Sequence, residues 1–199
     1  MKILNLYCGI GGNRKLWGNE HEITAVEFNE DIADKYKKLY PNDNVIVADA
    51  HQYLLDNYSD YDFIWTSPPC QTHSRANYFI NYITNSRYPD MKLWQEIIFL
   101  KTFFKGKFCV ENVVSYYEYF IESQVIGRHF LWSNFVIPKI DLPKGEVGTM
   151  MKQYVGTEKH AHSKKLEDRN AVNSELGLHI LNRALGIHID NNREQGRLF

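Results

Sequence analysis

Short apolar runs alternate with amphipathic segments along most of the chain. Apolar runs bounded by turn residues are typical of buried strands, and apolar groups spaced about 3.6 residues apart are typical of helices. The expected strands span residues 2–6, 22–26, 44–47, 63–65, 108–110 and 128–132. The expected helices span residues 32–39, 50–56, 91–104 and 175–185, with a helix start near 13–17. This alternation predicts an α/β fold with a doubly wound, mostly parallel sheet.

The fourth expected strand, residues 63–65, runs through Pro68 and Pro69 into Cys70. Proline fixes φ and cannot donate to a sheet ladder, so the strand ends there and the cysteine lies on a stiff turn. Ligands in open α/β sheets gather at the carboxyl ends of strands. On position alone, the alternative is a small buried hydrophobe at the start of a loop.

A glycine-rich turn, residues 7–12, follows the first expected strand and precedes a helix start. Glycine allows close approach of the backbone, and a helix N-terminus offers free N–H groups, so such a turn can hold a nucleotide-like ligand. The dinucleotide pattern G-x-G-x-x-G is not met, because Arg14 stands where the third glycine belongs, which disfavours an NAD enzyme. If the strand order reverses between the first and fourth strands, this turn and Cys70 face each other across one crevice.

Three acidic residues stand at the ends of other expected strands. Glu27 can accept both hydroxyls of a ribose, or it is a solvated loop acid. Asp49 is placed to accept from an adenine amino group, and it can also cap the following helix. Glu111 is expected to be partly desolvated and able to hold or donate a proton, with an ordinary strand-end acid as the alternative.

Residues 71–77 are polar and lack strong periodicity, which predicts a loop that runs to about residue 90 and is able to close over a ligand. Arg75 and Arg87 in this loop suit phosphate contacts, and the alternative for each is a solvated surface cation. His160 and His162 form half a metal site, but no cysteine or carboxylate has the matching spacing, so we expect no metal.

The 199 residues carry a formal net charge of −1, which disfavours a globally basic nucleic-acid binder and leaves room for a local basic face. Cysteines are sparse, and there is neither a secretory start nor an apolar run long enough to span a bilayer. We therefore expect reduced thiols, no membrane partner and a cytoplasmic location. The sequence leaves the oligomeric state open, and a monomer is favoured. Cys8 and Cys109 are interpreted as buried structural residues.

An ordered set of six motifs resembles those of the DNA (cytosine-5)-methyltransferases, almost from end to end of the chain. The first motif is the cofactor turn F-x-G-x-G-G, with Tyr7 in place of Phe. The acids Glu27 and Asp49 fall at the next two motifs. The nucleophile motif P-P-C-Q-x-x-S is matched by Pro68, Pro69, Cys70, Gln71 and Ser74. The later motifs are E-N-V at Glu111, Asn112 and Val113, three places of Q-x-R-x-R-x-F at Gln124, Arg128 and Phe130, and a final motif at residues 170–172 and 175–177.

The resemblance implies the Rossmann-like class I fold of S-adenosylmethionine-dependent methyltransferases, with a small recognition lobe. It implies a catalytic and cofactor-binding core at 1–138, a reduced target-recognition lobe at 139–168, a helix returning to the core at 169–190 and a frayed tail at 191–199. It also implies a DNA partner, base flipping of the target cytosine and a role in restriction–modification.

The same resemblance implies the roles of individual residues. Cys70 would attack C6 of the cytosine, and a polar helix-start environment should help this thiol to ionise. Glu111 would contact N3 and the exocyclic amine, Arg128 would donate to O2, and Asn112 would support the site. S-adenosylmethionine would be held by Tyr7, Gly9, Gly11, Gly12, Glu27, Phe28, Asp49, Ala50, Pro68, Asn170 and Val172. Nucleic acid would contact Gln71, Ser74, Arg75, Arg87, Lys144, Lys152, Lys164 and Lys165.

Two departures from the family pattern stand out. Ile126 replaces the first arginine of Q-x-R-x-R, which removes one expected polar support. Residues 139–168 are too few for an independent recognition core, so we expect a short target or weak sequence reading, with phosphate contacts dominant. The core motifs leave open a tRNA methyltransferase of the same family, a non-catalytic module that binds cofactor or DNA, and an enzyme that methylates free deoxycytidine monophosphate.

Overall fold

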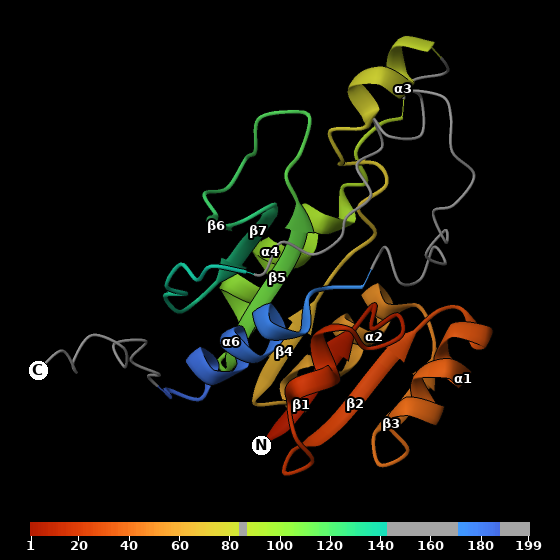
Figure 1. Cartoon of the computed structure of the whole chain (residues 1–199), viewed down its shortest axis with the longest axis vertical. Coiled ribbons are helices and arrows are strands. Elements are labelled where there is room, and N and C mark those ends of the chain that lie inside the picture. The colour runs from red at the N-terminus through yellow and green to blue at the C-terminus, as the bar shows by residue number, and fades with distance from the viewer. Residues whose placement is uncertain (84–86, 143–170, 188–199) are drawn as a thin grey trace, which may run out of the picture.

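The alternating apolar runs form the strands of a central sheet in the computed structural model, which describes residues 1–83, 87–142 and 171–187 (Figure 1). The strands are β1 (Lys2–Leu6), β2 (Glu22–Glu27), β3 (Asn44–Val47), β4 (Phe63–Thr66), β5 (Lys107–Val113), β6 (Gln124–Ile126) and β7 (His129–Ser133). Within the described ranges their order is β3-β2-β1-β4-β5-β7-β6. Strands β1 to β5 pair in parallel, whereas β7 is antiparallel to both β5 and β6. The strand order reverses between β1 and β4, which is the condition under which the glycine-rich turn and Cys70 share one crevice.

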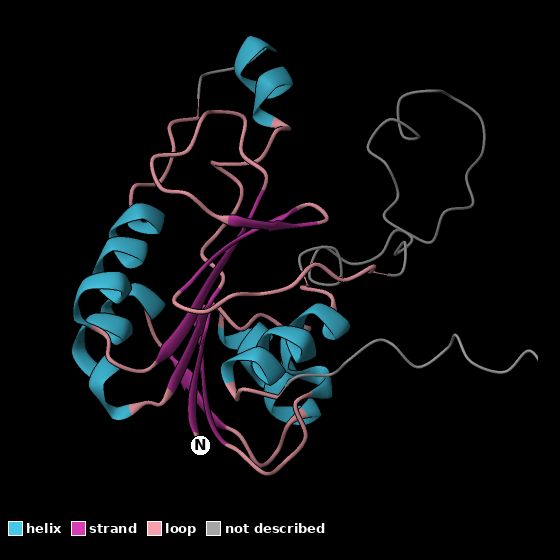
Figure 2. Cartoon of the chain, turned by 90° about the vertical axis from the view of Figure 1, so that its left-hand side faces the viewer, coloured by secondary structure: helices cyan, strands magenta, loops and turns pink. Residues whose placement is uncertain are grey.

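Helices connect the strands and cover both faces of the sheet, which Figure 2 shows nearly edge-on. They are η1 (Asn13–Leu16), α1 (Glu30–Leu39), α2 (Ala50–Asn57), η2 (Tyr58–Asp60), α3 (Asn77–Ile83), α4 (Lys92–Phe103) and α6 (Ser174–Ala184). Asn29, Asp49 and Asn173 cap α1, α2 and α6 by accepting from backbone N–H groups in the first turn. The predicted capping role of Asp49 is confirmed, and Gly186 has the positive φ of 73° expected after the end of α6.

The two-residue period of the strands divides the core between the two faces. Leu4 and Leu6 of β1 pack with α2 and α4 on one face. Ile3 of the same strand packs with Trp17, just after η1, and with Leu176 of α6 on the other face. Helices on both faces fit a Rossmann-like fold of the class I methyltransferase type, and they leave the carboxyl ends of the parallel strands free for a site.

A buried carboxylate ties the carboxyl ends of β1 and β4 to the helices on one face. Glu96 of α4 is fully buried, and it accepts hydrogen bonds from Tyr7 Oη at 2.6 Å and Thr66 Oγ1 at 2.8 Å. His51 Nδ1 of α2 lies 2.9 Å from the same carboxylate, and this hydrogen bond raises the pKa of His51. The network fixes Tyr7, whose φ of 53° turns the chain out of β1 into the glycine-rich turn.

Arg14 explains why the dinucleotide glycine pattern fails. Its side chain is buried and forms two hydrogen bonds with Asp43, from Nε at 2.9 Å and from Nη2 at 3.0 Å. The guanidinium also lies 5.0 Å from the centre of the Tyr40 ring. Because Tyr36 Oη donates to the same Asp43, the charge is paired and hydrogen-bonded. A third glycine would leave this carboxylate without its buried cation.

Three sequence predictions about the elements were wrong. The expected loop at 71–90 contains α3, because an aromatic run without clear periodicity still folds as a short helix. Strand β5 continues to Val113 because β7 pairs with it, so Glu111 lies within the strand and not after its end. Arg128 lies in the turn that joins β7 to β6, a strand that the sequence did not predict.

Several predicted features fall outside the described residues. These are most of the proposed recognition lobe with Lys144, Lys152, Lys164 and Lys165, the histidines His160 and His162, the cofactor candidate Asn170 and the tail from residue 188. Within the described ranges, no helix is long and apolar enough to cross a membrane. The same ranges hold no cluster of three or more His, Cys, Asp or Glu residues arranged to hold a metal ion.

Candidate active site

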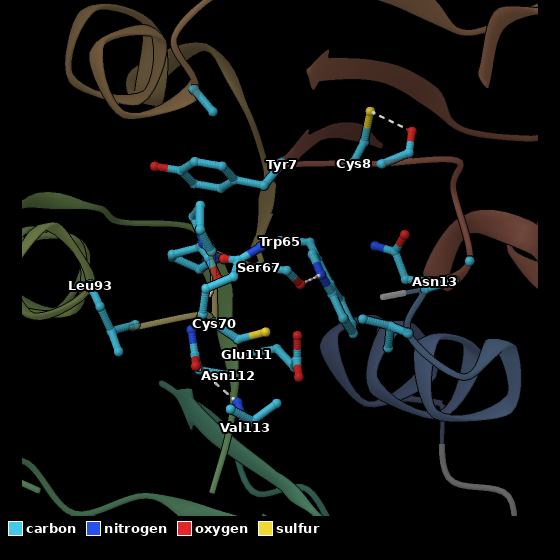
Figure 3. A pocket seen from close by; sticks show the side chains of 18 of the residues that line it. Tyr7, Cys8, Asn13, Trp65, Ser67, Cys70, Leu93, Glu111, Asn112 and Val113 are labelled. Atoms are coloured by element: carbon cyan, nitrogen blue, oxygen red, sulfur yellow. Dashed lines mark hydrogen bonds between the residues drawn. The ribbon is translucent and has the colours of Figure 1, made fainter. Parts of the chain in front are cut away.

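A cavity of about 610 Å³ lies at the carboxyl ends of the parallel strands, where the strand order reverses (Figure 3). The glycine-rich turn after β1 and the turn after β4 both line it, so the predicted crevice exists. Its lining includes most of the predicted site residues: Tyr7, Gly9, Gly12, Glu27, Phe28, Asp49, Ala50, Pro68, Cys70, Gln71, Glu111, Asn112, Arg128 and Val172.

Each glycine of the turn is required for a different reason. Gly9 has a φ of 54° and lines the cavity, and a Cβ there would meet no atom within 4 Å, so its backbone is open to a ligand. A Cβ on Gly11 would come within 2.4 Å of the Tyr40 ring. A Cβ on Gly12 would come within 2.5 Å of Val172 O, so this glycine allows the segment before α6 to pack beside the turn.

The carboxylate of Glu27 is held in place at the end of β2. Its Oε2 accepts from Gly9 N at 3.1 Å and its Oε1 accepts from Asn29 N at 3.0 Å. Each oxygen keeps a further lone pair with which it can accept from a hydroxyl group. The adjoining Phe28 side chain lines the cavity and is 78% exposed, which leaves an aromatic face available to a planar ring.

Asp49 lies at the end of β3, on the same side of the cavity. The backbone N–H of Gln52 donates to Oδ1 at 3.1 Å and lowers the pKa of the Asp49 carboxyl group. Lys92 Nζ lies 3.5 Å from Oδ2. These groups together fit a nucleoside-containing cofactor such as S-adenosylmethionine. They are the accessible backbone of Gly9, the Glu27 carboxylate that can accept from ribose hydroxyls, the exposed ring of Phe28 and the ionised carboxylate of Asp49.

The turn that carries Cys70 is fixed from both sides. Asn112 of β5 donates from Nδ2 to Pro68 O at 3.0 Å, which ties the end of β4 to its neighbouring strand. Beyond the prolines, Cys70 O accepts from His73 N and Ser74 N, both at 3.0 Å. The Asn112 amide therefore holds the chain just before the cysteine, and its role in supporting the reaction stays a prediction.

The Cys70 thiol is half-buried and turned toward the Glu111 carboxylate (Figure 3). Burial raises the pKa of this thiol, and the negative charge of Glu111 raises it further, whereas Arg128 acts in the opposite direction. The expectation that a polar helix-start environment ionises the thiol was wrong. Helix α3 begins at Asn77, several residues after the cysteine, and the local charge next to the sulfur is an anion.

His129 is a site residue that the sequence analysis missed. Its Nδ1 lies 2.6 Å from Glu111 Oε1, and both side chains are buried at the wall of the cavity. In the β5–β7 ladder Glu111 pairs with Leu131, so His129, two residues away on the same face, reaches it diagonally. The available signal was Ile126, which stands in place of an arginine and removes one expected polar support from the site.

Two further cavity residues that the sequence analysis did not single out support the Cys70 turn. His73 is buried with Nδ1 2.6 Å from Tyr117 Oη, and burial lowers the pKa of its imidazole. Trp65 donates from Nε1 to Ser67 Oγ at 2.8 Å, which fixes the indole beneath the cavity. Both contacts hold the chain on either side of Cys70 in one conformation.

The predicted nucleic-acid contacts have different surroundings. Gln71 lines the cavity next to Cys70. Ser74 Oγ accepts from Ala76 N at 3.3 Å, so this hydroxyl also supports the local turn. Arg75 and Arg87 are exposed and lie outside the cavity lining.

Comparison with known proteins decides the family. Residues 1–115, more than half of the chain, match the model of the family described as C-5 cytosine-specific DNA methylase. The chain belongs to this family. The matched segment contains the glycine-rich turn, Cys70 and Glu111, whereas Arg128, His129 and α6 follow it. Members of this family are S-adenosylmethionine-dependent methyltransferases. No curated protein matches the chain.

Solved structures similar to this chain include several methyltransferases. A mutant of Spodoptera frugiperda DNMT2 is 28% identical, with a TM-score of 0.41, and the match covers 56% of this chain and 35% of that one. A SAM-dependent methyltransferase from Agrobacterium tumefaciens is 15% identical, with a TM-score of 0.40 and coverage of 60% and 41%. Entamoeba histolytica EhMeth is 15% identical, with a TM-score of 0.38 and coverage of 57% and 38%. This chain thus spans about a third of the length of the DNMT2 chain.

The surroundings of Cys70 predict how its reactivity depends on pH. Because the pKa of the thiol is raised, the rate of alkylation by iodoacetamide should keep rising with pH beyond the ordinary range of a free cysteine. Glu111→Gln removes the neighbouring anion and should accelerate alkylation at neutral pH, whereas Arg128→Gln should slow it. Peptide mass spectrometry distinguishes Cys70 from the buried Cys8 and Cys109. A thiol that titrates below the ordinary range in the wild type would contradict this description.

Proposed function

We propose that this chain transfers a methyl group from S-adenosylmethionine to C5 of a cytosine in DNA, through a covalent bond between Cys70 and C6. The observation that carries this proposal is one cavity lined by the glycine-rich turn with Glu27 on one side and by Cys70 and Glu111 on the other. Cytosine C5 is a poor nucleophile, so the ring must be activated before it can accept a methyl group. A nucleophile beside a group that holds a proton meets that need.

S-adenosylmethionine, when bound, supplies an electrophilic methyl group on a sulfonium. In the proposed binding mode, Glu27 accepts from the ribose hydroxyls and Asp49 accepts from the adenine amino group. The exposed ring of Phe28 covers one face of the adenine. These residues hold the cofactor on the β1–β3 side of the cavity, across from the turn that carries Cys70.

The proposed activation of the cytosine uses three side chains from the β4–β7 side. The thiol proton of Cys70 passes to the ionised Glu111 carboxylate, the thiolate attacks C6, the electrons of the C5–C6 double bond move to C5, and N3 shares the proton that Glu111 now holds. Arg128 donates to O2, where negative charge otherwise gathers. C5 then takes the methyl group and S-adenosylhomocysteine is left. A water molecule takes the C5 proton, the sulfur–C6 bond breaks, and the proton shared by N3 and Glu111 returns to Cys70, which restores the thiol and the aromatic ring. Splitting one difficult step into easier ones is the gain from covalent catalysis.

The raised pKa of Cys70 sets a condition on this mechanism. At neutral pH the free protein holds mostly the protonated thiol, because burial and the Glu111 charge disfavour the thiolate. A cytosine that shares a proton with Glu111 neutralises part of that charge. Substrate binding is thus expected to favour ionisation of the nucleophile, which protects the empty site from side reactions.

His129 is proposed as the residue that positions Glu111. A carboxylate that must face both N3 and the amino group needs a fixed orientation. A donor at 2.6 Å on Oε1 restricts rotation of the carboxylate and leaves Oε2 unengaged by His129. This contact provides a polar support for Glu111 in a chain that has Ile126 at the place of the missing arginine.

A tritiated-methyl transfer assay tests the proposed function. Incubation with labelled S-adenosylmethionine and either duplex DNA, single-stranded DNA, tRNA or deoxycytidine monophosphate should label DNA. Cys70→Ser should lower the rate by at least about a thousandfold, because the step that activates the ring is lost. Cofactor binding by this variant, measured by calorimetry, should stay within about twofold of wild type. Label on tRNA or on the free nucleotide alone, or equal rates for wild type and Cys70→Ser, would refute the proposal.

His129 variants separate positioning from a purely structural role. His129→Phe keeps a ring but removes the donor to Glu111, and the unsatisfied buried carboxylate should lower kcat by about tenfold to a hundredfold. His129→Asn places an amide N–H close to the position of Nδ1 and should recover most of the rate. The KM for S-adenosylmethionine should change little in either variant. Equal loss of activity in both, in step with loss of thermal stability, would assign His129 to packing alone.

A further inference from the structure

Helix α3 is anchored to the turn that carries Cys70. Asn77, its first residue, is fully buried and donates from Nδ2 to Gln71 O at 2.8 Å. At the other end of the segment, Asp90 N donates to Thr72 Oγ1 at 3.1 Å. Both ends of the segment that contains α3 are thus fixed within two residues of Cys70, and the helix projects beyond the carboxyl ends of the strands (Figure 1).

This segment exposes large aromatic side chains to solvent. Tyr78 and Phe79 on α3 are 62% and 73% exposed, and Tyr88 is 82% exposed. Single exposed apolar residues are ordinary on protein surfaces, but a group of aromatic rings within eleven residues is a common feature of binding surfaces. Aromatic rings contribute large contact areas when a partner covers them.

Contacts with the segment after β5 hold Tyr78 and Arg87 of this segment in place. The Tyr78 ring lies 5.9 Å from the Tyr116 ring in an edge-to-face arrangement. Tyr116 Oη donates to Arg87 O at 3.1 Å, and Arg87 N donates to Asn81 Oδ1 at 2.8 Å. These contacts place Tyr78, Arg87 and Tyr116 side by side. We use the name α3 surface for Arg75, Tyr78, Phe79, Arg87 and Tyr88.

The charge of the α3 surface indicates the chemistry of its partner. Residues 75–88 contain two arginines and no acidic residue, although the whole chain has a net charge of −1. In the described part of the chain, neither the Arg75 nor the Arg87 guanidinium forms an ion pair with a carboxylate. A partner that offers both negative charge and aromatic faces matches this surface, and a nucleic-acid strand with exposed bases offers both.

We propose that the α3 surface stacks on unpaired bases that flank the target cytosine, so that the preferred substrate is a single strand or a loop. A duplex hides the faces of its bases and presents backbone and groove edges instead, so it leaves the rings of Tyr78 and Phe79 without a matching surface. Arg75 and Arg87 contact the phosphates of the same strand. The inference rests on the proposed function for the identity of the target base.

Binding without cofactor tests the inference independently of methyl transfer. Fluorescence anisotropy is measured with a labelled single-stranded DNA oligonucleotide containing one cytosine, its duplex, and the RNA strand of the same sequence. The single strand should bind at least about tenfold more tightly than the duplex. Phe79→Ala should weaken single-strand binding by about tenfold. Phe79→Leu, which keeps an apolar side chain without a π face, should weaken it to a similar extent.

Matched variants complete the design. Phe103 near the end of α4 is 55% exposed and lies outside the α3 surface, so Phe103→Ala should bind as the wild type does. The double variant Arg75→Gln/Arg87→Gln should reduce the salt dependence of binding, whereas Phe79→Ala should leave the salt dependence unchanged. The comparison of DNA and RNA strands identifies which sugar is preferred.

The outcomes distinguish this inference from the proposed function. The stacking surface would be overturned if the duplex bound more tightly than the single strand. It would also be overturned if Phe79→Ala and Phe79→Leu bound the single strand as tightly as the wild type does. Either result would hold even if DNA is methylated. Loss of single-strand binding in both variants, without methyl transfer by the wild type to any substrate, would support the stacking surface and refute the proposed function.

Discussion

The antiparallel pairing of β7 with β5 is the constraint on which the candidate site depends. It extends β5 through Glu111 and Asn112 to Val113, beyond the point where the parallel strands end. The same ladder brings His129 to the Glu111 carboxylate, and the turn before β7 places Arg128 at the cavity. Asn112 then links this strand pair to the Pro68 turn. One pairing register thus sets the positions of the proposed acid, its support and the nucleophile.

The reversal of strand order between β1 and β4 brings the cofactor side of the cavity next to this assembly. The Glu96 network strengthens that junction, because one buried carboxylate holds Tyr7 at the end of β1 and Thr66 at the end of β4. A buried acceptor with three partners is costly to disturb. The distance between the glycine-rich turn and the Cys70 turn is therefore fixed by the core and not by flexible loops.

Local sequence signals predicted the parallel half of the sheet well. Strands β1 to β4 and the crevice could be predicted, because their signals are local in the sequence. These signals are the apolar runs, the glycine-rich turn, and Pro68 and Pro69, which end the strand before Cys70. The Glu111–His129 contact could not, because it depends on a register set across two strands. The raised pKa of Cys70 arises from burial and from that same carboxylate, which are tertiary effects. Helix α3 lacked a periodic pattern because Tyr78 and Phe79 both face solvent.

The central claim is that Cys70 forms a covalent bond with C6 of a cytosine in a nucleic-acid strand. A strand containing 5-fluorocytosine tests it most directly, because fluorine at C5 takes the place of the proton that must leave, so the bond cannot be released. After incubation with S-adenosylmethionine and denaturation, mass spectrometry should find the methylated strand attached to the peptide that contains Cys70. An adduct that still forms in Cys70→Ser would contradict the claim. So would the absence of an adduct in the wild type under conditions in which it methylates unmodified cytosine.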